Sequence, residues 1–264
     1  MEVLHLFVLC YTYTLFFSIL KPDVASSDAT NMECTLHRDK DHFIINVFYK
    51  KYLHSDSDIQ RHNSIFFSLI PWNLPVSSLV PSMLFISVDA IHGGHFEIHF
   101  DNVRVPASNI LLGEERGFEI AQGQLGPGRL HHCMRAVGLA EWVLELLCQC
   151  IEVVAHWIAE CRITISQSRL LTLHAAHTLD TQGNKAGRKH IAMIKVAAGR
   201  MASKVVDCAI QVYGGAGVSD DFPLVEMYAY ARTLRIADGP DEVHLSTIAL
   251  PELRDQRRRA QAKL

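Results

Sequence analysis

Residues 96–120 read FEIHFDNVRVPASNILLGEERGFEI, and the period of the hydrophobic pattern changes within this stretch. Apolar side chains occupy every second position of residues 96–100, which is typical of a strand with one buried face. Pro106 then marks a loop that ends near Gly113. From Gly117 onward the apolar residues follow helical spacing. The stretch therefore joins a part of the chain rich in strands to a helical part.

The amino-terminal side of this junction has the pattern of a β domain. Proline and glycine separate short apolar runs, such as residues 43–48, 65–70 and 83–88, and each run has the length of a strand. Residues 50–64 are polar and without a clear period, which predicts a loop. We predict a partial β-rich domain over residues 21–112.

The first twenty residues, MEVLHLFVLCYTYTLFFSIL, form an apolar extension. Their length is borderline for a spanning helix, and Glu2 and His5 stand where a signal peptide or an anchor would carry lysine or arginine. Phenylalanine, tyrosine and threonine also favour strands. We therefore expect a buried strand or a disordered extension here, and not a membrane anchor.

On the carboxyl-terminal side, the pattern predicts an antiparallel helical bundle over residues 113–250. Apolar residues recur at spacings of three and four through residues 129–180, 184–213 and 223–235. Gly183 separates the first two of these helices. The fold class predicted for the chain is α+β, a small β-rich domain followed by this bundle.

The last helix is expected to begin after Gly239-Pro240, because proline is favoured in the first turn of a helix. Pro251 is expected to interrupt it, because a proline removes a helical hydrogen bond. Residues 251–264 then read as a basic, solvated tail.

The totals exclude several classes of partner and site. The formal net charge of −3 provides no field that would favour nucleic acid or an acidic membrane. Seven cysteines without a CxxC pair indicate free thiols in a reducing compartment. His95, Glu97 and His99 share one strand face, but the Cα atoms of the two histidines would lie ~13 Å apart. We therefore expect no metal site.

Two short motifs could carry chemistry, and each also has a plain structural interpretation. The glycine-rich residues 214–217 follow a long helix and could bring backbone N–H groups to a phosphate, or could simply end the helix. Residues 238–242 read DGPDE and place carboxylates beside a helix start. There an aspartate can cap the helix, or it can serve as a base in a dry cleft.

Taken together, these motifs resemble the acyl-CoA dehydrogenase family. Residues 96–120 resemble the stretch that leaves the β domain of that family and enters its bundle. Residues 211–217 (QVYGGAG) resemble its flavin-contacting turn, and residues 236–244 (IADGPDEVH) its catalytic loop. The likeness is greatest to family members ten and eleven, which also carry Asp-Gly-Pro-Asp-Glu. The similar segments are residues 16–46, 91–147 and 151–264.

The resemblance implies an FAD-dependent dehydrogenation of acyl-CoA thioesters in fatty acid oxidation, for long or branched chains. Asp238 would be the base that takes the α-proton, in place of the usual glutamate. The resemblance also implies an electron acceptor such as electron-transferring flavoprotein, and a homo-oligomer. The residues implied in substrate binding are Arg129, Ser26 and Ser27, and those implied in cofactor binding are Gln211, Gly214, Gly215, Gly217 and Gly239.

The chain also departs from the family in segments that contact flavin. Leu20-Lys21 replaces a Thr-Glu pair, and residues 47–56 replace a strand that contains tryptophan. An Arg-x-x-Phe loop is missing between Cys150 and Ile151, so residues 145–161 are predicted to form one unbroken helix. These departures predict an incomplete fold with weak flavin binding. The alternative function is a catalytically impaired fragment that interacts with full-length subunits.

The chain ends in Ala262-Lys263-Leu264, which is close to the peroxisomal signal Ser-Lys-Leu. We expect a peroxisomal location in preference to a mitochondrial one.

Overall fold

The chain folds into two compact units, residues 1–122 and 123–264. The structure is a computed structural model. The residues that it describes are 4–11, 35–46, 64–71, 78–81, 96–99, 102–114, 116–149 and 155–261.

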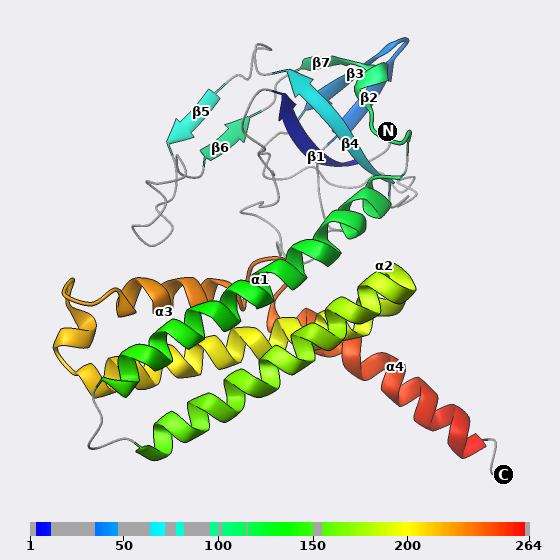
Figure 1. Ribbon diagram of the computed structural model, residues 1–264. Helices are drawn as coiled ribbons and strands as arrows, with labels where there is room; N and C mark the ends of the chain where they lie inside the picture. The colour runs from blue at the N-terminus through cyan, green and yellow to red at the C-terminus, as the bar shows by residue number, and fades with distance from the viewer. Residues whose placement is uncertain are drawn as a thin grey trace, which may run out of the picture. The chain divides into compact units, whose positions relative to one another are not determined.

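The first unit contains short strands in three small sheets (Figure 1). One sheet pairs β1 (Leu4–Tyr11) with β4 (Ser64–Pro71) in parallel. The second is antiparallel, with the order β2 (Thr35–Asp39), β3 (His42–Asn46) and β7 (Val103–Pro106). The third pairs β5 (Ser78–Pro81) with β6 (Phe96–His99), also antiparallel. A 3-10 turn, η2 (Ala107–Asn109), follows β7.

The three-stranded sheet buries apolar side chains of β3 and β7 on one face. Phe43 pairs with Val105 and Ile45 with Val103, and all four side chains are buried. Successive side chains of a strand point to opposite faces, so these four share one face. The apolar side chains at these four positions thus define the buried face of the sheet.

Several expectations for the first unit are confirmed. The apolar runs at 43–48, 65–70 and 96–100 correspond to β3, β4 and β6, and part of the apolar extension forms β1. The run at 83–88 and residues 51–63 lie outside the described residues. In the part of the chain that is described, no helix is long and apolar enough to cross a membrane.

Among the described residues, four helices make up the second unit, and the first of them starts before residue 123 (Figure 1). They are α1 (Gly117–Cys148), α2 (Ala155–Tyr213), α3 (Leu224–Thr233) and α4 (Asp241–Gln261), with a 3-10 turn, η3 (Ala216–Val218), between α2 and α3.

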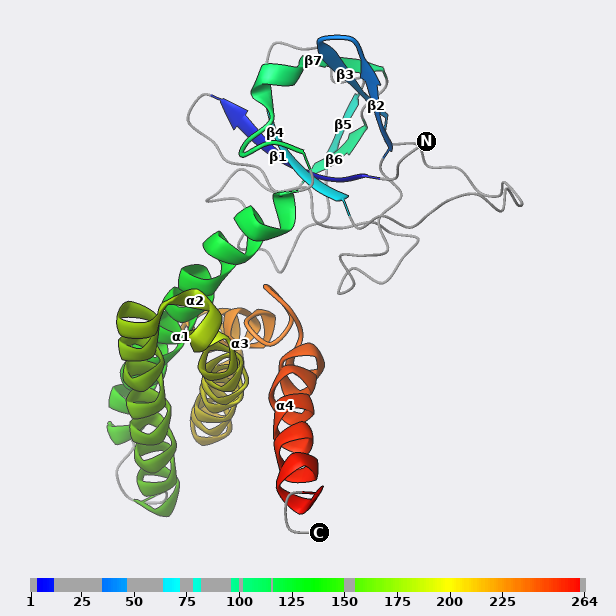
Figure 2. The same ribbon diagram turned by 90° about the vertical axis from the view of Figure 1, so that its right-hand side faces the viewer.

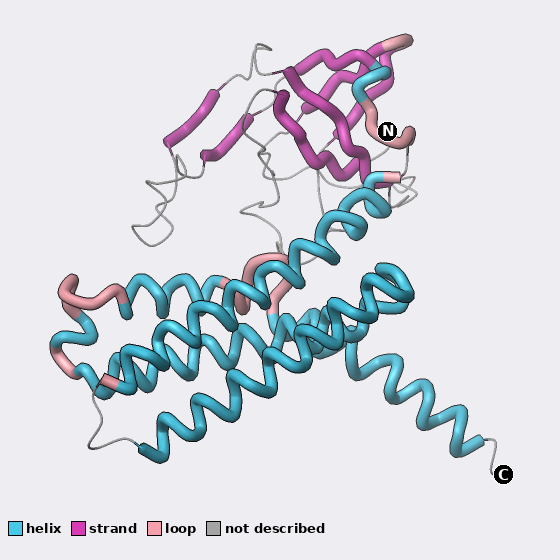
Figure 3. Tube along the Cα trace, in the orientation of Figure 1, coloured by secondary structure: helices cyan, strands magenta, loops and turns pink. Residues whose placement is uncertain are grey.

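The long helix α2 folds back on itself at Gly183. This glycine has φ 80° and ψ 176°, a backbone conformation that residues with a Cβ atom rarely adopt. The first arm of α2 (residues 155–182) and the second arm (residues 184–213) then run side by side, as Figures 2 and 3 show. Lys204 Nζ of the second arm lies 3.1 Å from Glu160 Oε2 of the first. The predicted separation of two helices at Gly183 is confirmed.

The prediction of one unbroken helix over residues 145–161 is wrong. Helix α1 ends at Cys148 and α2 begins at Ala155. Arg162 Nη1 lies 2.8 Å from Glu141 Oε1, whereas 21 residues of one continuous helix would span ~30 Å. The helices fold back because both have apolar faces that must be buried, and this gain outweighs the local preference for a longer helix.

The bundle closes its core within this chain. Buried residues of α1, both arms of α2 and α3 pack into two clusters. The larger cluster includes Val143, Leu147, Ile165, Val205 and Leu224. The second arm of α2 contributes to both clusters, so it lies at the centre of this packing.

Helix α4 begins at Asp241, directly after Gly239-Pro240 as predicted. It continues through Pro251 to Gln261, so the expected interruption at Pro251 is wrong. Residues 249–261 are exposed, so water can bond the carbonyl oxygen of Thr247 that Pro251 leaves without a helical partner.

Candidate active site

The loop between α3 and α4, residues 234–241, carries the predicted base and is called the Asp238 loop below. Asp238 has φ 56° and Gly239 has φ 103°, two consecutive residues in the left-handed region. Glycine adopts this conformation freely, and aspartate tolerates it better than most residues. Pro240 then leads into α4, whose first turn carries Asp241. The chain reverses sharply here and leaves the Asp238 side chain 21% exposed.

Two side chains bond the backbone carbonyl of Asp238. Arg129 Nε, from α1, donates to this oxygen at 2.9 Å. His244 Nε2, from α4, lies 3.2 Å from the same oxygen. A carbonyl can only accept hydrogen bonds, so Nε2 of His244 carries the proton. The position of Asp238 is therefore fixed by residues of two other helices.

His132 faces the carboxylate itself. It lies three residues after Arg129, on the same face of α1, and its Nε2 atom is 3.3 Å from Asp238 Oδ2. Burial lowers the pKa of His132, although the nearby charge of Asp238 acts in the opposite direction. The Nδ1 atom of this ring is buried without a hydrogen-bond partner. The His132 ring thus occupies one side of the carboxylate.

Burial also shifts the other ionisable groups around the loop. It lowers the pKa of His244 to about 4, with the charges of Arg129 and Lys195 acting in the same direction. It lowers the pKa of Arg129 and of Lys195 as well. The surroundings of Asp238 are therefore poorly hydrated, which strengthens the electrostatic interactions among its neighbours.

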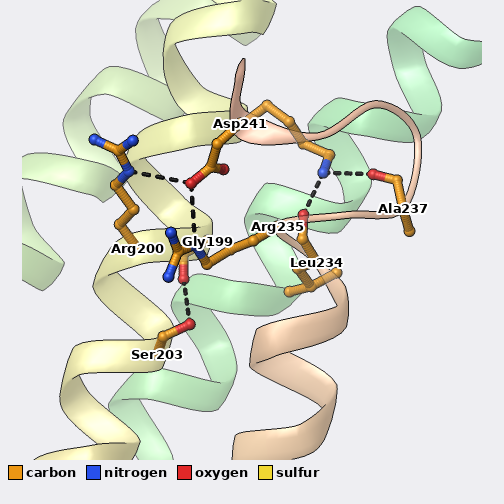
Figure 4. Close-up of polar contacts among 8 residues, drawn as sticks. Gly199, Arg200, Ser203, Leu234, Arg235, Ala237 and Asp241 are labelled. Atoms are coloured by element: carbon orange, nitrogen blue, oxygen red, sulfur yellow. Dashed lines mark hydrogen bonds and ion pairs between the residues drawn. The ribbon is translucent and has the colours of Figure 1, made fainter. Parts of the chain in front are cut away.

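The second arm of α2 also contacts this loop, as Figure 4 shows. Lys195 Nζ donates to the carbonyl oxygens of Leu234 and Ala237, the latter at 2.7 Å. Asp241, only 2% exposed, accepts from Arg200 Nε at 3.1 Å and from Arg235 Nε at 3.0 Å. The loop is thus held at both of its ends.

The arrangement suits proton abstraction. A half-buried carboxylate is held on a tight turn, one of its oxygens faces the His132 ring, and two cations lie close to its backbone. A carboxylate in poorly hydrated surroundings can act as a general base. Of the residues predicted for the site, the structure brings Asp238, Gly239 and Arg129 together.

Sequence reasoning assigned no role to three neighbours of Asp238. Lys195 is the one charged residue in the apolar run IAMIKVAAG. A lysine in such a run indicates a buried ammonium group that must have hydrogen-bond partners. His244 stands inside the quoted motif at residues 236–244 and His132 inside the similar segment 91–147, but no spacing rule connects them to Asp238. Ser26 and Ser27 lie outside the described residues.

The glycine-rich turn at residues 214–217 is built differently. Gly214, with φ 56°, ends α2, and its N–H bonds the carbonyl of Ile210 at 2.9 Å. Gly217 is buried, and a Cβ there would lie 2.7 Å from that same carbonyl oxygen. Gly214 and Gly215 are exposed, and nothing lies within 4 Å of where their Cβ atoms would be. Their open backbone fits the close approach of a cofactor phosphate.

This turn follows the carboxyl end of the second arm, whereas the Asp238 loop contacts the middle of that arm. Lys195, at the Asp238 loop, and Tyr213, beside the turn, are separated by ~27 Å of helix at 1.5 Å per residue. Gln211 is exposed one turn before Gly214. The structure therefore does not bring Gln211, Gly214, Gly215 and Gly217 next to Asp238 within one chain.

The family model for the carboxyl-terminal domain of acyl-CoA dehydrogenases matches residues 115–250, more than half of the chain. The chain belongs to the acyl-CoA dehydrogenase family. The matched residues contain both the glycine-rich turn and the Asp238 loop, so both motifs lie in the domain that the resemblance assigned to them.

Relatives of this acyl-CoA dehydrogenase chain confirm the likeness to members ten and eleven. Family member 11 of Homo sapiens is 51% identical over all of this chain, which spans 39% of that protein. Family member 10 of Mus musculus is 40% identical over 92% of the chain, which spans 25% of that protein. A solved structure from Mycobacterium abscessus, titled as an acyl-CoA dehydrogenase, is 36% identical with a TM-score of 0.77. It covers 96% of this chain, which covers 67% of it.

The chain is shorter than the region that it matches. It spans well under half the length of the human relative. The alignment with that relative runs over 307 positions and this chain has 264 residues, so at least 43 positions of the relative have no counterpart.

Proposed function

We propose that the protein is an FAD-dependent acyl-CoA dehydrogenase of fatty acid oxidation with Asp238 as its catalytic base. The proposal rests chiefly on the geometry of the Asp238 loop, where a carboxylate is held on a left-handed turn by residues from α1, α2 and α4. Strained backbone that is fixed from several sides is typical of functional sites. The substrate is an acyl-CoA thioester, and electrons leave to an acceptor such as electron-transferring flavoprotein.

In this proposal, Asp238 takes the proton from Cα of the thioester. The Cα–H bond breaks, and the proton moves to a carboxylate oxygen. His132 occupies the side of Oδ2, which leaves Oδ1 free to face the substrate. FAD, when bound, supplies the acceptor for the hydride that leaves Cβ. The poorly hydrated surroundings keep water away from the carboxylate and favour proton transfer from carbon.

Aspartate is one methylene shorter than glutamate, so its reach depends on the backbone. Arg129 and His244 hold the Asp238 carbonyl, and the left-handed turn directs the side chain outward from the loop. The resemblance assigns Arg129 to the substrate, and its contact with Asp238 gives it a supporting part as well. Among the predicted cofactor residues, Gln211, Gly214 and Gly215 are exposed and would hold FAD through open backbone and an amide side chain.

The test is the visible absorption spectrum of the purified chain with FAD and an acyl-CoA, recorded without oxygen. The proposal predicts a bound flavin band that bleaches when the acyl-CoA is added. Asp238→Asn should bind the same flavin and leave the band unbleached. A chain that binds no FAD at any concentration, or that bleaches equally in both forms, would contradict the proposal.

A second candidate is a family fragment that binds full-length dehydrogenase subunits. The absence of at least 43 positions found in the human relative favours it. Large apolar side chains also stay exposed on α1 and on the first arm of α2, namely Trp142, Trp157, Ile163, Leu170 and Leu173. Co-purification of a colourless chain with a full-length subunit would support this candidate. A yellow homo-oligomer that turns over acyl-CoA would exclude it.

A further inference from the structure

Lys195, Gly199 and Arg200 of the second arm of α2 each contact the Asp238 loop, and these three residues are called the α2 platform below. The three residues meet the loop at Leu234, Arg235, Ala237 and Asp241. Figure 4 draws the hydrogen bonds to Leu234, Ala237 and Asp241.

Gly199 allows the loop to approach the helix closely. A Cβ at this position would lie 2.9 Å from Cγ of Arg235 and 3.8 Å from its Cα. A side chain at residue 199 would therefore push Arg235 outward. Arg235 also bonds Asp241, so the displacement would reach both ends of the loop.

Lys195 connects the platform to the turn that carries the base. Lys195 is only 3% exposed, and its ammonium group donates to two backbone carbonyls, one at the carboxyl end of α3 and one next to Asp238. A cation is favoured at the negative end of a helix dipole, which explains the contact with Leu234. The contact with Ala237 goes beyond helix capping, because this carbonyl lies past the end of α3 and directly before Asp238.

The loop needs such support more than an ordinary turn does. Asp238 is held at φ 56°, and left-handed conformations of residues with a Cβ persist only where surrounding structure fixes them. The aspartate is also the shorter of the two acidic residues, so a small retraction of the loop would take its carboxylate out of reach of a substrate.

We propose that Lys195 is a positioning residue of the dehydrogenase, which holds the backbone of the Asp238 loop forward so that the short carboxylate reaches the substrate. This inference rests on the proposed function for its catalytic part. Its structural part, that the platform fixes the loop, stands on the contacts alone.

The experiment compares Lys195→Met, which keeps the length of the side chain and removes its donors, with Lys204→Met. Lys204 lies on the same arm and pairs with Glu160 at the surface, so it is a matched control. The first readout is amide hydrogen exchange of residues 235–239 in the full chain, which needs no turnover. We expect exchange about tenfold faster in Lys195→Met and unchanged in Lys204→Met.

The second readout separates positioning from stability. Well below the melting temperature, Lys195→Met should lower kcat by about tenfold to a hundredfold, with KM within about threefold. Replacing Asp238 by glutamate in the Lys195→Met background should recover about tenfold of kcat, because the extra methylene restores the lost reach. A role in stability alone would lower the melting temperature without this recovery.

Gly199→Ala provides a second route if Lys195→Met does not fold. It keeps Lys195 and displaces Arg235, and it should raise exchange at 235–239 and lower kcat in the same way. Unchanged exchange in the folded variants, or an unchanged kcat in an active enzyme, would overturn the inference. If the wild-type chain shows no turnover, the proposed function fails, and the exchange at 235–239 still decides whether the platform holds the loop.

Discussion

The Asp238 loop and the glycine-rich turn at residues 214–217 each follow a helix, and each contains a residue in the left-handed conformation. The glycine-rich turn is held by its own backbone, through hydrogen bonds from Gly214 to Ile210 and from Gly217 to Gly214. The Asp238 loop is held by side chains of α1, α2 and α4, from residues as far as 109 positions away in the sequence.

This difference shows how the same local conformation can serve two purposes. A turn made by its own backbone is insensitive to its neighbours and can present bare glycines to a ligand. A loop held by distant donors depends on the packing of the whole bundle, and it can keep a carboxylate in a place that its own sequence does not favour. The predictions below test this contrast.

The largest expected effect is the loss of the base. Asp238→Asn keeps the size of the side chain and removes its basicity, so the rate of flavin reduction by acyl-CoA should fall about a thousandfold. FAD and acyl-CoA should bind as before. Rapid-mixing absorption without oxygen measures the rate. Asp255→Asn, on the exposed part of α4, is the control, and a fall of less than tenfold for Asp238→Asn would remove Asp238 as the base.

The next effect concerns stability at the glycine-rich turn. In Gly217→Ala the new Cβ would meet the backbone of Ile210, which cannot move aside, so the free energy of unfolding should fall by about 2 kcal/mol. In Gly215→Ala the Cβ meets open space at φ −58°, and the change should stay within about 0.5 kcal/mol. Urea unfolding of the two variants measures both, and equal losses would show that the turn is not held by its backbone packing.

The Asp238 loop should respond to pH through His244. Burial lowers the pKa of this histidine to about 4, from an ordinary value of 6.5. Between these values the unfolded chain binds a proton at His244 and the folded chain does not, so the free energy of unfolding falls as the pH drops from about 6.5 to about 4.

His244→Gln keeps an N–H donor for the Asp238 carbonyl and removes this titration. Between pH 7 and pH 4 the variant should lose about 2 kcal/mol less stability than the wild type. Urea unfolding of both proteins at both pH values gives the two losses of stability. Subtracting one loss from the other removes the contribution of the carboxylates, which is the same in the two proteins. Parallel losses would mean that His244 is not buried against the loop.

The smallest effect is expected at Arg129. A lysine there keeps the charge but loses the fixed geometry of the Nε–H donor, so kcat should fall by about fivefold. Steady-state kinetics measures it, with Arg254→Lys on exposed α4 as the control. An unchanged kcat would mean that Arg129 of α1 does not position Asp238, and that residues of α2 and α4 alone hold the loop.

Features made by local chemistry could be predicted from the sequence. The helix break at Gly183, the helix end at Gly214 and the buried face of β3 each follow from residue types and spacing within a few positions. The place of Asp238 in a catalytic loop came from resemblance to the family, because DGPDE alone is equally compatible with a helix cap.

Features made by tertiary packing could not be predicted in this way. Residues 145–161 have helical propensity throughout, and only the burial of facing apolar surfaces separates α1 from α2. Lys195 and His132 reach the Asp238 loop across 42 and 106 positions, and no local pattern encodes these contacts. The helix continues through Pro251 because its neighbours are exposed, and water can bond the carbonyl oxygen that the proline leaves without a partner.

The most direct test of the account is hydrogen exchange at Cα of the substrate. An acyl-CoA labelled with deuterium at Cα is incubated with the chain and FAD without an electron acceptor, and mass spectrometry follows the loss of the label to water. The account predicts rapid loss with the wild-type chain and a rate reduced about a thousandfold with Asp238→Asn. Equal rates for the two proteins, or no loss above the rate without protein, would contradict the assignment of Asp238 as the base.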